Sequence, residues 1–183
     1  MGEYELTELW KTIEYKFNID LKNDFSNKNV EGWLSHFIPN KKIYISQFGK
    51  DATGKRGKGK TIKIYTGNLF SSLVKGCIPA KLMGKIVFKR LSKQNFSHSE
   101  VELLGIQKNI ETENQITAHF RYKRFNNLGG MFESAIGIYA LAEIKGKWFI
   151  NAVSIYDDND KEISKVNLSE MWYPKKQNSF NGN

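Results

Sequence analysis

The chain has 183 residues, the length of one ordinary domain, and its 28 basic and 19 acidic residues give a formal net charge of +9. Hydrophobic residues make up 40% of the sequence, which is enough to build a packed core and excludes a wholly disordered chain. A single cysteine, Cys77, excludes a disulfide framework and a four-thiolate zinc site, and three scattered histidines form no metal cluster, so we expect neither a metal nor another cofactor.

The N-terminus carries no targeting signal that the sequence reveals. It begins Met-Gly-Glu-Tyr-Glu-Leu, which is acidic where a signal peptide is basic and then apolar. No apolar run reaches the roughly 18–20 residues that a membrane span needs. We therefore expect a soluble, cytoplasmic protein with no membrane contact.

The first part of the chain is predicted to be helical. Apolar residues recur at helical spacing from Tyr4 to about Phe37, and Pro39-Asn40 ends this region. Residues 43–48 are rich in β-branched and aromatic side chains, which predicts the first strand. A polar, glycine-rich loop is expected over residues 49–60.

The middle of the chain is predicted to return to helix and then to change to strands. Residues Ile62 to Val74 are predicted as a third helix that stops at Gly76. From about Ile86 onward, short apolar runs alternate with turn residues. Five strands are predicted, over residues 85–91, 99–110, 115–125, 132–144 and 147–156.

Alternation along two of these strands predicts which side chains share a face. One face of the strand 115–125 is apolar, and His119 belongs to the opposite face, which we expect to point outward. The apolar set consists of Ile116, Ala118, Phe120 and Tyr122. In the strand 132–144 the apolar set consists of Ile136, Ile138, Ala140, Ala142 and Ile144, and we interpret it as facing the core.

Helices followed by an antiparallel meander predict an α+β fold. We expect a curved mixed or antiparallel sheet that wraps around the N-terminal helices, with hairpin turns at residues 126–130 and 145–146. One domain is predicted over residues 1–160. Residues 161–183 are mostly polar and are expected to form a partly disordered C-terminal extension.

The segment 54–61 reads GKRGKGKT and matches the Walker A pattern of nucleotide-binding P-loops. A P-loop directly follows a buried parallel strand, whereas polar residues 50–53 precede this segment and hairpins dominate the second half of the chain. Four of its eight residues are Lys or Arg, so a match by chance is easy. We therefore do not expect nucleotide hydrolysis.

The same loop concentrates positive charge. From Lys41 to Lys63 there are eight basic residues against one acidic residue, Asp51. Such a loop attracts an anionic partner, such as a nucleic acid backbone or an acidic substrate, or else it is a solvated loop that keeps the protein soluble. The candidate anion-binding residues are Lys55, Arg56, Lys58 and Lys60.

Three stretches resemble the nuclear-transport-factor-2-like superfamily, which includes SnoaL-like cyclases, ketosteroid isomerases and scytalone dehydratase. They are residues 30–37 (VEGWLSHF) with the strand at 42–45, the segment that begins at Ile62, and residues 138–150 (IYALAEIKGKWFI). The resemblance spans roughly residues 4–156. It implies a cone-shaped sheet with an apolar cavity, and a homodimer through the convex face of the sheet.

The resemblance does not carry over the carboxylates of a ketosteroid isomerase. The position of its catalytic base is matched by Ser46, and the position of its second acid by Ile138. An unassisted serine cannot abstract a proton next to a carbonyl, because that step needs a base poised near neutral pH. Isomerase chemistry of this type is therefore not expected.

Tyrosine hydroxyls that reach the cavity remain as candidates, although core packing is the simpler interpretation of each. The candidate catalytic residues are Tyr44, Ser46, Tyr122 and Tyr156. The candidate ligand-binding residues are Trp10, Tyr15, Trp33, Phe120, Ile136 and Ile138.

Two functions follow. The first is binding of a small hydrophobic molecule in the cavity, with cyclisation, dehydration or isomerisation by positioning and hydrogen bonding. The alternative is a non-catalytic dimeric module whose basic loop, residues 50–63, contacts an anionic partner. The sequence does not decide whether the protein is an enzyme.

Overall fold

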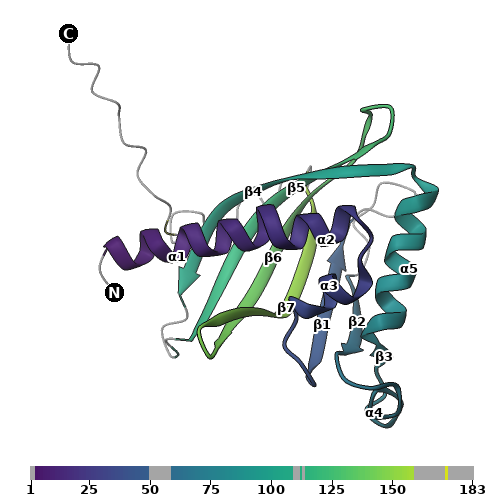
Figure 1. Ribbon diagram of the computed structural model, residues 1–183, viewed down its shortest axis with the longest axis horizontal. Helices are drawn as coiled ribbons and strands as arrows, with labels where there is room; N and C mark the ends of the chain where they lie inside the picture. Colours follow the sequence, from purple (N-terminus) through teal and green to yellow (C-terminus); the bar gives the residue numbers. More distant parts are fainter. Residues whose placement is uncertain (1–2, 50–58, 109–111, 113, 159–171, 173–183) are drawn as a thin grey trace.

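A computed structural model describes residues 3–49, 59–108, 112, 114–158 and 172. It shows one strongly curved sheet with helices packed against its concave face (Figure 1). The predicted α+β class and the cone shape are confirmed, and the sheet does not close into a barrel.

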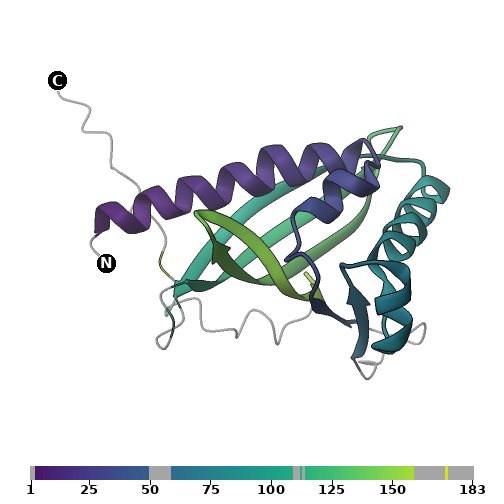
Figure 2. The same cartoon turned by 60° about the horizontal axis from the view of Figure 1, so that its bottom comes forward.

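The N-terminal helices run across the inside of the sheet (Figure 2). The helix α1 (Glu3–Tyr15) continues without a break through the π-helical segment η1 (Lys16–Leu21) into α2 (Lys22–Ser26). The helix α3 (Val30–Ser35) starts at Asn29, whose side chain accepts a hydrogen bond from the backbone N–H of Gly32.

The sheet contains seven strands in the order β3-β2-β1-β7-β6-β5-β4. Pairs β1·β7 and β2·β3 are parallel and the other pairs are antiparallel. The strands are β1 (Lys42–Phe48), β2 (Lys60–Tyr65), β3 (Ile78–Pro79), β4 (Phe96–Lys108), β5 (Gln115–Asn126), β6 (Met131–Ile144) and β7 (Lys147–Asp157). The predicted first strand, the last four strands and both hairpin turns are confirmed.

Two predicted elements are wrong. The expected helix from Ile62 to Val74 is the strand β2 followed by a short helix, α4 (Leu69–Val74). In β2 the residues Ile62 and Ile64 alternate with exposed polar side chains, which is a strand pattern, and the helix begins only after its cap, Asn68.

The expected strand 85–91 is part of the helix α5 (Ala80–Lys93). The run Ile86-Val87-Phe88 has strand propensity, but burial follows a helical period instead. The buried residues of α5 are Ala80, Gly84, Phe88 and Leu91.

Aromatic side chains form much of the core between helices and sheet. The ring of Phe17 in η1 stacks on Phe120 of β5 with 3.9 Å between ring centroids, and Tyr139 of β6 meets Phe17 edge-on at 4.9 Å. Trp33 of α3 packs edge-on against Phe37 and Phe88. These contacts hold the helices at a fixed height above the sheet and leave space beside them.

Candidate functional site

The space between the helices and the concave face of the sheet is a cavity of about 680 Å³. Its walls come from η1, α2, α3 and α5 on one side and from strands β1, β2 and β4–β7 on the other. Most lining residues are apolar, and the volume lies within the range of small-molecule sites. The cavity is therefore the first candidate for a binding site.

Gly137 of β6 gives the cavity wall its shape. A Cβ atom at this position would lie 2.5 Å from the ring of Tyr139, which lines the cavity. The absence of a side chain at Gly137 allows the Tyr139 ring to lie across the strand. Ala135, two residues earlier on the same face, is also small and buried.

Tyr122 and Arg124 of β5 are the notable polar groups of the inner wall. The Tyr122 hydroxyl and the Arg124 Nε atom are both buried, and neither has a hydrogen-bond partner among the described residues. Buried polar groups are almost always paired, so two unpaired groups of neighbouring side chains in a cavity indicate a site for something else to bind. Both residues line the cavity.

The Arg124 side chain is held in place by aromatic rings and a carboxylate. Its guanidinium lies 4.7 Å from the centre of the Tyr122 ring and 4.9 Å from that of Phe25. Its Nη1 donates to the carboxylate of Glu133 on β6. The ion pair and the rings fix the orientation of the guanidinium, which leaves Nε as a preoriented donor.

Both cavity tyrosines are donors at neutral pH. Burial raises the pKa of Tyr122 well above its usual value, and burial also raises the pKa of Tyr139. The two hydroxyls therefore stay protonated at neutral pH.

Charged and polar side chains surround the mouth of the cavity. Lys60 of β2 and Arg90 of α5 line the cavity and are exposed, as are Gln47 and Gln94. Together with Lys22 and Arg124 the lining includes four cations, and Glu133 is its one carboxylate among the described residues. This charge distribution favours a ligand that carries negative charge or an electron-rich oxygen.

Only one of the four candidate catalytic residues lies at the cavity. Tyr122 lines it, whereas Tyr44, Ser46 and Tyr156 lie on the convex face, so the expectation that they reach inward is wrong. The reason is strand parity: Ile43 and Ile45 of β1 point inward, so their neighbours point outward. On that face the Ser46 hydroxyl is 2.8 Å from that of Thr61, and the Tyr156 ring stacks on Phe48.

The candidate ligand-binding residues divide in the same way. Trp33 and Phe120 line the cavity. Trp10 packs against Trp172 with 5.9 Å between ring centroids, and Tyr15 is 60% exposed, so neither lines it.

Ile136 and Ile138 lie on the convex face of β6, which corrects the predicted parity of this strand. Ile136 pairs with Arg121 and Ile138 with His119, and these β5 residues alternate with the inward Phe120 and Tyr122. His119 is on the predicted face but is buried, and burial lowers its pKa to about 4. The predicted outward face is therefore confirmed, and the side chain is covered on that face.

Of the candidate anion-binding residues, Lys60 is at the cavity mouth. Lys55, Arg56 and Lys58 lie outside the described residues. The sequence analysis missed Arg124, Glu133 and Tyr139. Continuing the alternation of Phe120 and Tyr122 by two residues would have found Arg124.

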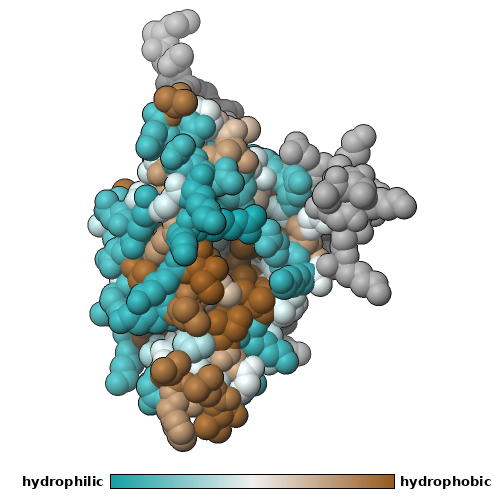
Figure 3. Space-filling model, turned by 90° about the vertical axis from the view of Figure 1, so that its right-hand side faces the viewer, coloured by the Kyte–Doolittle hydropathy of each residue, from teal (hydrophilic) through white to brown (hydrophobic). Residues whose placement is uncertain are grey.

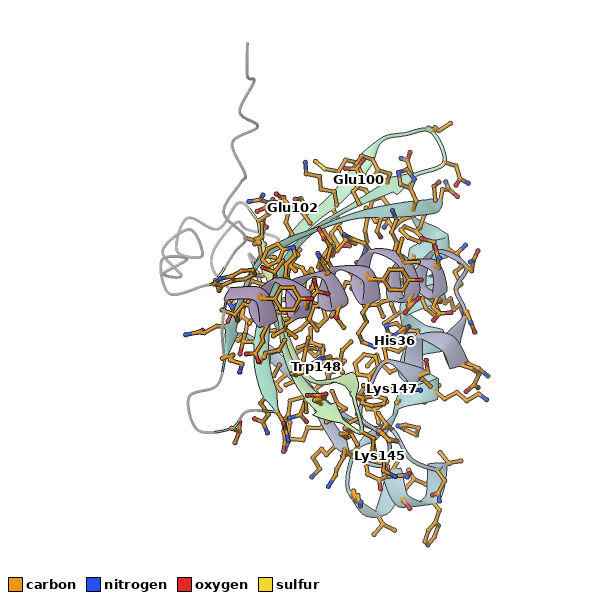
Figure 4. All side chains as sticks on the ribbon, turned by 60° about the vertical axis from the view of Figure 1, so that its left-hand side comes forward. His36, Glu100, Glu102, Lys145, Lys147 and Trp148 are labelled. Atoms are coloured by element: carbon orange, nitrogen blue, oxygen red, sulfur yellow. The ribbon has the colours of Figure 1, made fainter. Side chains whose placement is uncertain are left out.

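A second titratable cluster lies outside the cavity. His36 Nε2 is 2.9 Å from the carboxylate of Asp24, and its Nδ1 is 3.1 Å from Lys16 Nζ. The His36 carbonyl also accepts a hydrogen bond from the backbone N–H of Ile150, so His36 lies beside the start of β7 (Figure 4). Burial lowers the pKa of His36, and the cluster joins η1, α2 and α3 to the sheet.

The described residues contain no group of three or more His, Cys, Asp or Glu side chains placed to hold a metal ion. Within the same part of the chain, no helix combines the length and the apolar character needed to cross a membrane.

No protein-family model matches the sequence, and no curated protein matches it. Solved structures show the same fold at low identity. The chain is similar to ActVI-ORFA from Streptomyces coelicolor, with a TM-score of 0.56, 7% identity, and coverage of 84% of this chain and 97% of that one.

Two further solved structures are similar to this chain, and both belong to proteins of unknown function. A domain with a cystatin-like fold from Nostoc punctiforme has a TM-score of 0.53 and 9% identity, and the match covers 90% of this chain and 84% of that one. A protein from Mycobacterium tuberculosis has a TM-score of 0.53 and 9% identity, with 91% and 82% covered. The fold that the sequence resemblance implied is confirmed.

Proposed function

We propose that the protein binds a small, largely apolar molecule through one oxygen substituent, with this oxygen placed against Tyr122 and Arg124. The observation that carries the proposal is the pair of buried donors, the Tyr122 hydroxyl and Arg124 Nε, that have no partner among the described residues. A carbonyl, enolate or carboxylate oxygen accepts from both and removes the cost of leaving them unpaired.

The rest of the cavity supports an apolar body for this molecule. Aromatic and aliphatic side chains such as Phe17, Phe120 and Val153 line most of its wall. Lys60 and Arg90 at the mouth favour entry of an anion over a cation. An apolar molecule with one acidic or enolisable group satisfies both regions.

The same two donors suit an oxygen that carries negative charge, such as that of a bound enolate. Among the described lining residues the one carboxylate, Glu133, pairs with Arg124 and no histidine is present, so no residue is assigned to take up a proton and the proposal is limited to binding. Ser46 has no part in this proposal, because it lies on the convex face.

A pair of fluorescent probes tests the binding. One is 1-anilinonaphthalene-8-sulfonate, an apolar anion, and the other is N-phenyl-1-naphthylamine, which has the same rings without the sulfonate. We expect the anion to bind more tightly, and Arg124→Leu to weaken its binding by about 10–100-fold while the neutral probe changes little. The control is Arg121→Leu, on the convex face of the same strand.

Equal binding of the two probes, or equal losses in the two arginine variants, would overturn the proposal. Native mass spectrometry of protein purified from its own host complements this test, because a co-purified molecule identifies the ligand class directly. A co-purified apolar cation would contradict the assignment of Arg124.

We also infer a homodimer through the convex face of the sheet. Half-exposed apolar side chains gather there across β1, β6 and β7, as on surfaces that pair with a partner. They include Tyr44, Phe48, Ile136, Ile138, Ala140 and Tyr156. Light scattering on the eluted protein should give twice the chain mass, and Ile138→Asp should give the monomer; a monomeric wild type would exclude the dimer.

The module hypothesis has one supporting observation among the described residues. Lys60, at the end of the basic loop, is exposed, but it also lines the cavity. This position favours an anionic group of the cavity ligand over a separate anionic partner, so the cavity remains the first proposal.

A further inference from the structure

The helix α4 has an inverted pattern of burial. Its polar residue Ser72 is completely buried, whereas four large apolar side chains point to solvent. They are Leu69 (64% exposed), Phe70 (77%), Leu73 (65%) and Val74 (71%). A helix that only packs against the domain would bury these side chains and expose the serine.

Several hydrogen bonds hold α4 in this orientation. The Asn68 side chain accepts from the backbone N–H of Ser71 at 2.8 Å, and the Ser72 hydroxyl donates to the Asn68 carbonyl at 2.9 Å. Behind the helix, the backbone N–H of Cys77 donates to the Ser72 carbonyl, and Lys75 Nζ donates to the Tyr65 hydroxyl at 2.8 Å. The exposure of the apolar side chains is therefore built into the fold.

The part of the chain around α4 is strongly basic. Residues 41–93 contain 14 basic residues and one acidic residue, whereas the rest of the chain contains 14 basic and 18 acidic residues. The single acidic residue, Asp51, lies outside the described residues. No described residue within 41–93 therefore carries a carboxylate side chain.

Lysines lie on both sides of α4. Lys41 and Lys42 are exposed where β1 begins. The backbone carbonyl of Lys41 accepts a hydrogen bond from the backbone N–H of Thr66, and Lys42 lies opposite Tyr65 in the β1–β2 ladder. Both lysines therefore lie beside the segment that leads into α4. Lys81 is exposed in the first turn of α5, just after α4, but its ammonium group pairs with the carboxylate of Glu31 in α3.

The helix forms a projecting end of the molecule. It lies at the lower extremity of the ribbon, and the brown lower tip of the space-filling view is at the same place (Figures 1 and 3). Four apolar side chains on a projection offer a few hundred Å². This is less than the roughly 800 Å² per partner of a stable protein interface, but a bilayer accepts a small apolar projection that basic residues surround.

We propose that α4 docks the protein on the surface of an anionic lipid bilayer. Leu69, Phe70, Leu73 and Val74 enter the boundary between headgroups and acyl chains, and Lys41 and Lys42 contact the lipid phosphates. The sequence-based expectation of no membrane contact rested on the absence of a spanning segment, which docking of this kind does not need.

The helix α5 exposes two further apolar side chains. Leu82 and Ile86 are 50% and 51% exposed, and Ile86 lines the cavity. Docking of α4 does not depend on them, and it stands whether or not the cavity binds a ligand.

Sedimentation with vesicles tests the proposal on the full chain. Vesicles of phosphatidylcholine with a minor fraction of phosphatidylglycerol are compared with vesicles of phosphatidylcholine alone. We expect binding to the anionic vesicles that is at least about tenfold stronger and that weakens with salt. Because net charge alone attracts the protein to anionic lipid, this comparison is not sufficient.

The decisive variants are matched. Phe70→Ser with Leu73→Ser removes two apolar side chains of α4, and Leu128→Ser removes a side chain that is 95% exposed in the β5–β6 turn. We expect the α4 variant to bind anionic vesicles at least about tenfold more weakly, and the Leu128 variant to bind within twofold of the wild type. Equal melting temperatures would show that all three proteins are folded.

A Phe70→Trp variant gives a second measurement. Compared with the wild type, its tryptophan fluorescence should shift to shorter wavelength with anionic vesicles if residue 70 enters the bilayer, and bromine-labelled acyl chains should quench it. Three results would each overturn the proposal: no sedimentation with anionic vesicles, equal losses in the α4 and Leu128 variants, or an unshifted spectrum of the Phe70→Trp variant. Loss of ligand binding without loss of vesicle binding would count only against the cavity proposal.

Discussion

Arg121 and Arg124 lie three residues apart on β5, on opposite faces of the sheet, and they differ in how their donors are used. On the convex face, Arg121 donates to Glu102 at 2.9 Å and to Asp158 at 3.3 Å. On the concave face, Arg124 contacts Glu133 and two aromatic rings, and its Nε has no partner among the described residues. The donors of Arg121 are paired within the protein, whereas Arg124 keeps one donor without a partner among the described residues.

The largest difference between the two faces is expected in stability. Phe120→Ala should lower the free energy of unfolding by about 3–5 kcal/mol, because it opens a hole between Phe17 and the sheet. Ile138→Ala, on the half-exposed convex face, should cost less than about 2 kcal/mol. Urea unfolding measures both, and equal costs would show that the concave face is not the core.

A pH titration of stability tests the buried part of the convex face. The pKa of His119 is lowered by burial from 6.5 to about 4, so the unfolded chain takes up this proton first as the pH falls. The contribution of the neutral, buried His119 ring to the free energy of unfolding is fully present above pH 6.5. It is lost as the pH falls toward 4, and the loss amounts to at most about 3 kcal/mol. His119→Gln should flatten this part of the profile, and a profile identical to that of the wild type would contradict the burial of His119.

Tyr122→Phe should separate stability from binding. Removing a buried hydroxyl that has no partner among the described residues should raise the free energy of unfolding by about 1 kcal/mol. The same variant should bind the sulfonate probe several-fold more weakly. Tyr44→Phe is the control on the convex face, and a loss of stability in Tyr122→Phe would show that its hydroxyl is already satisfied.

The smallest effect is expected for Arg121→Gln. Its ion pairs are partly exposed, with 36% of the Arg121 side chain and 63% of the Glu102 side chain accessible, so the loss should stay within about 1 kcal/mol. Thermal melting at low and high salt measures it. A larger loss, or weaker probe binding, would remove the distinction between the two arginines.

Local sequence patterns were sufficient for the elements with one clear periodicity. The strands β4–β7 and their turns follow from alternation and turn residues, and the N-terminal helices follow from apolar spacing. The errors at β2 and α5 have a common cause. Runs such as Ile86-Val87-Phe88 carry both a strand propensity and one turn of a helical face, and only the packed neighbours decide between them.

Hydrophobicity could not show which residues of β6 face the cavity and which face the convex side of the sheet. Its convex face carries a row of isoleucine and alanine, so it looks more apolar than the concave face, which contains Ala135, Gly137 and Tyr139. The concave wall leaves room for a cavity through small residues at two of these positions, so its low hydrophobicity does not mean that it faces solvent. The two candidate ligand-binding isoleucines of this strand, Ile136 and Ile138, were therefore assigned to the wrong side of the sheet.

The pairing of β1 with β7 has a consequence for how the protein is made. Tyr44 lies opposite Ala152, so strands separated by roughly a hundred residues are hydrogen-bonded neighbours, and contacts of this range form slowly. During translation, β2 can cover one edge of β1 early, but the other edge stays open until β7 has left the ribosome. Because β1 is rich in aromatic and β-branched residues, this open edge exposes the nascent chain to pairing with other chains.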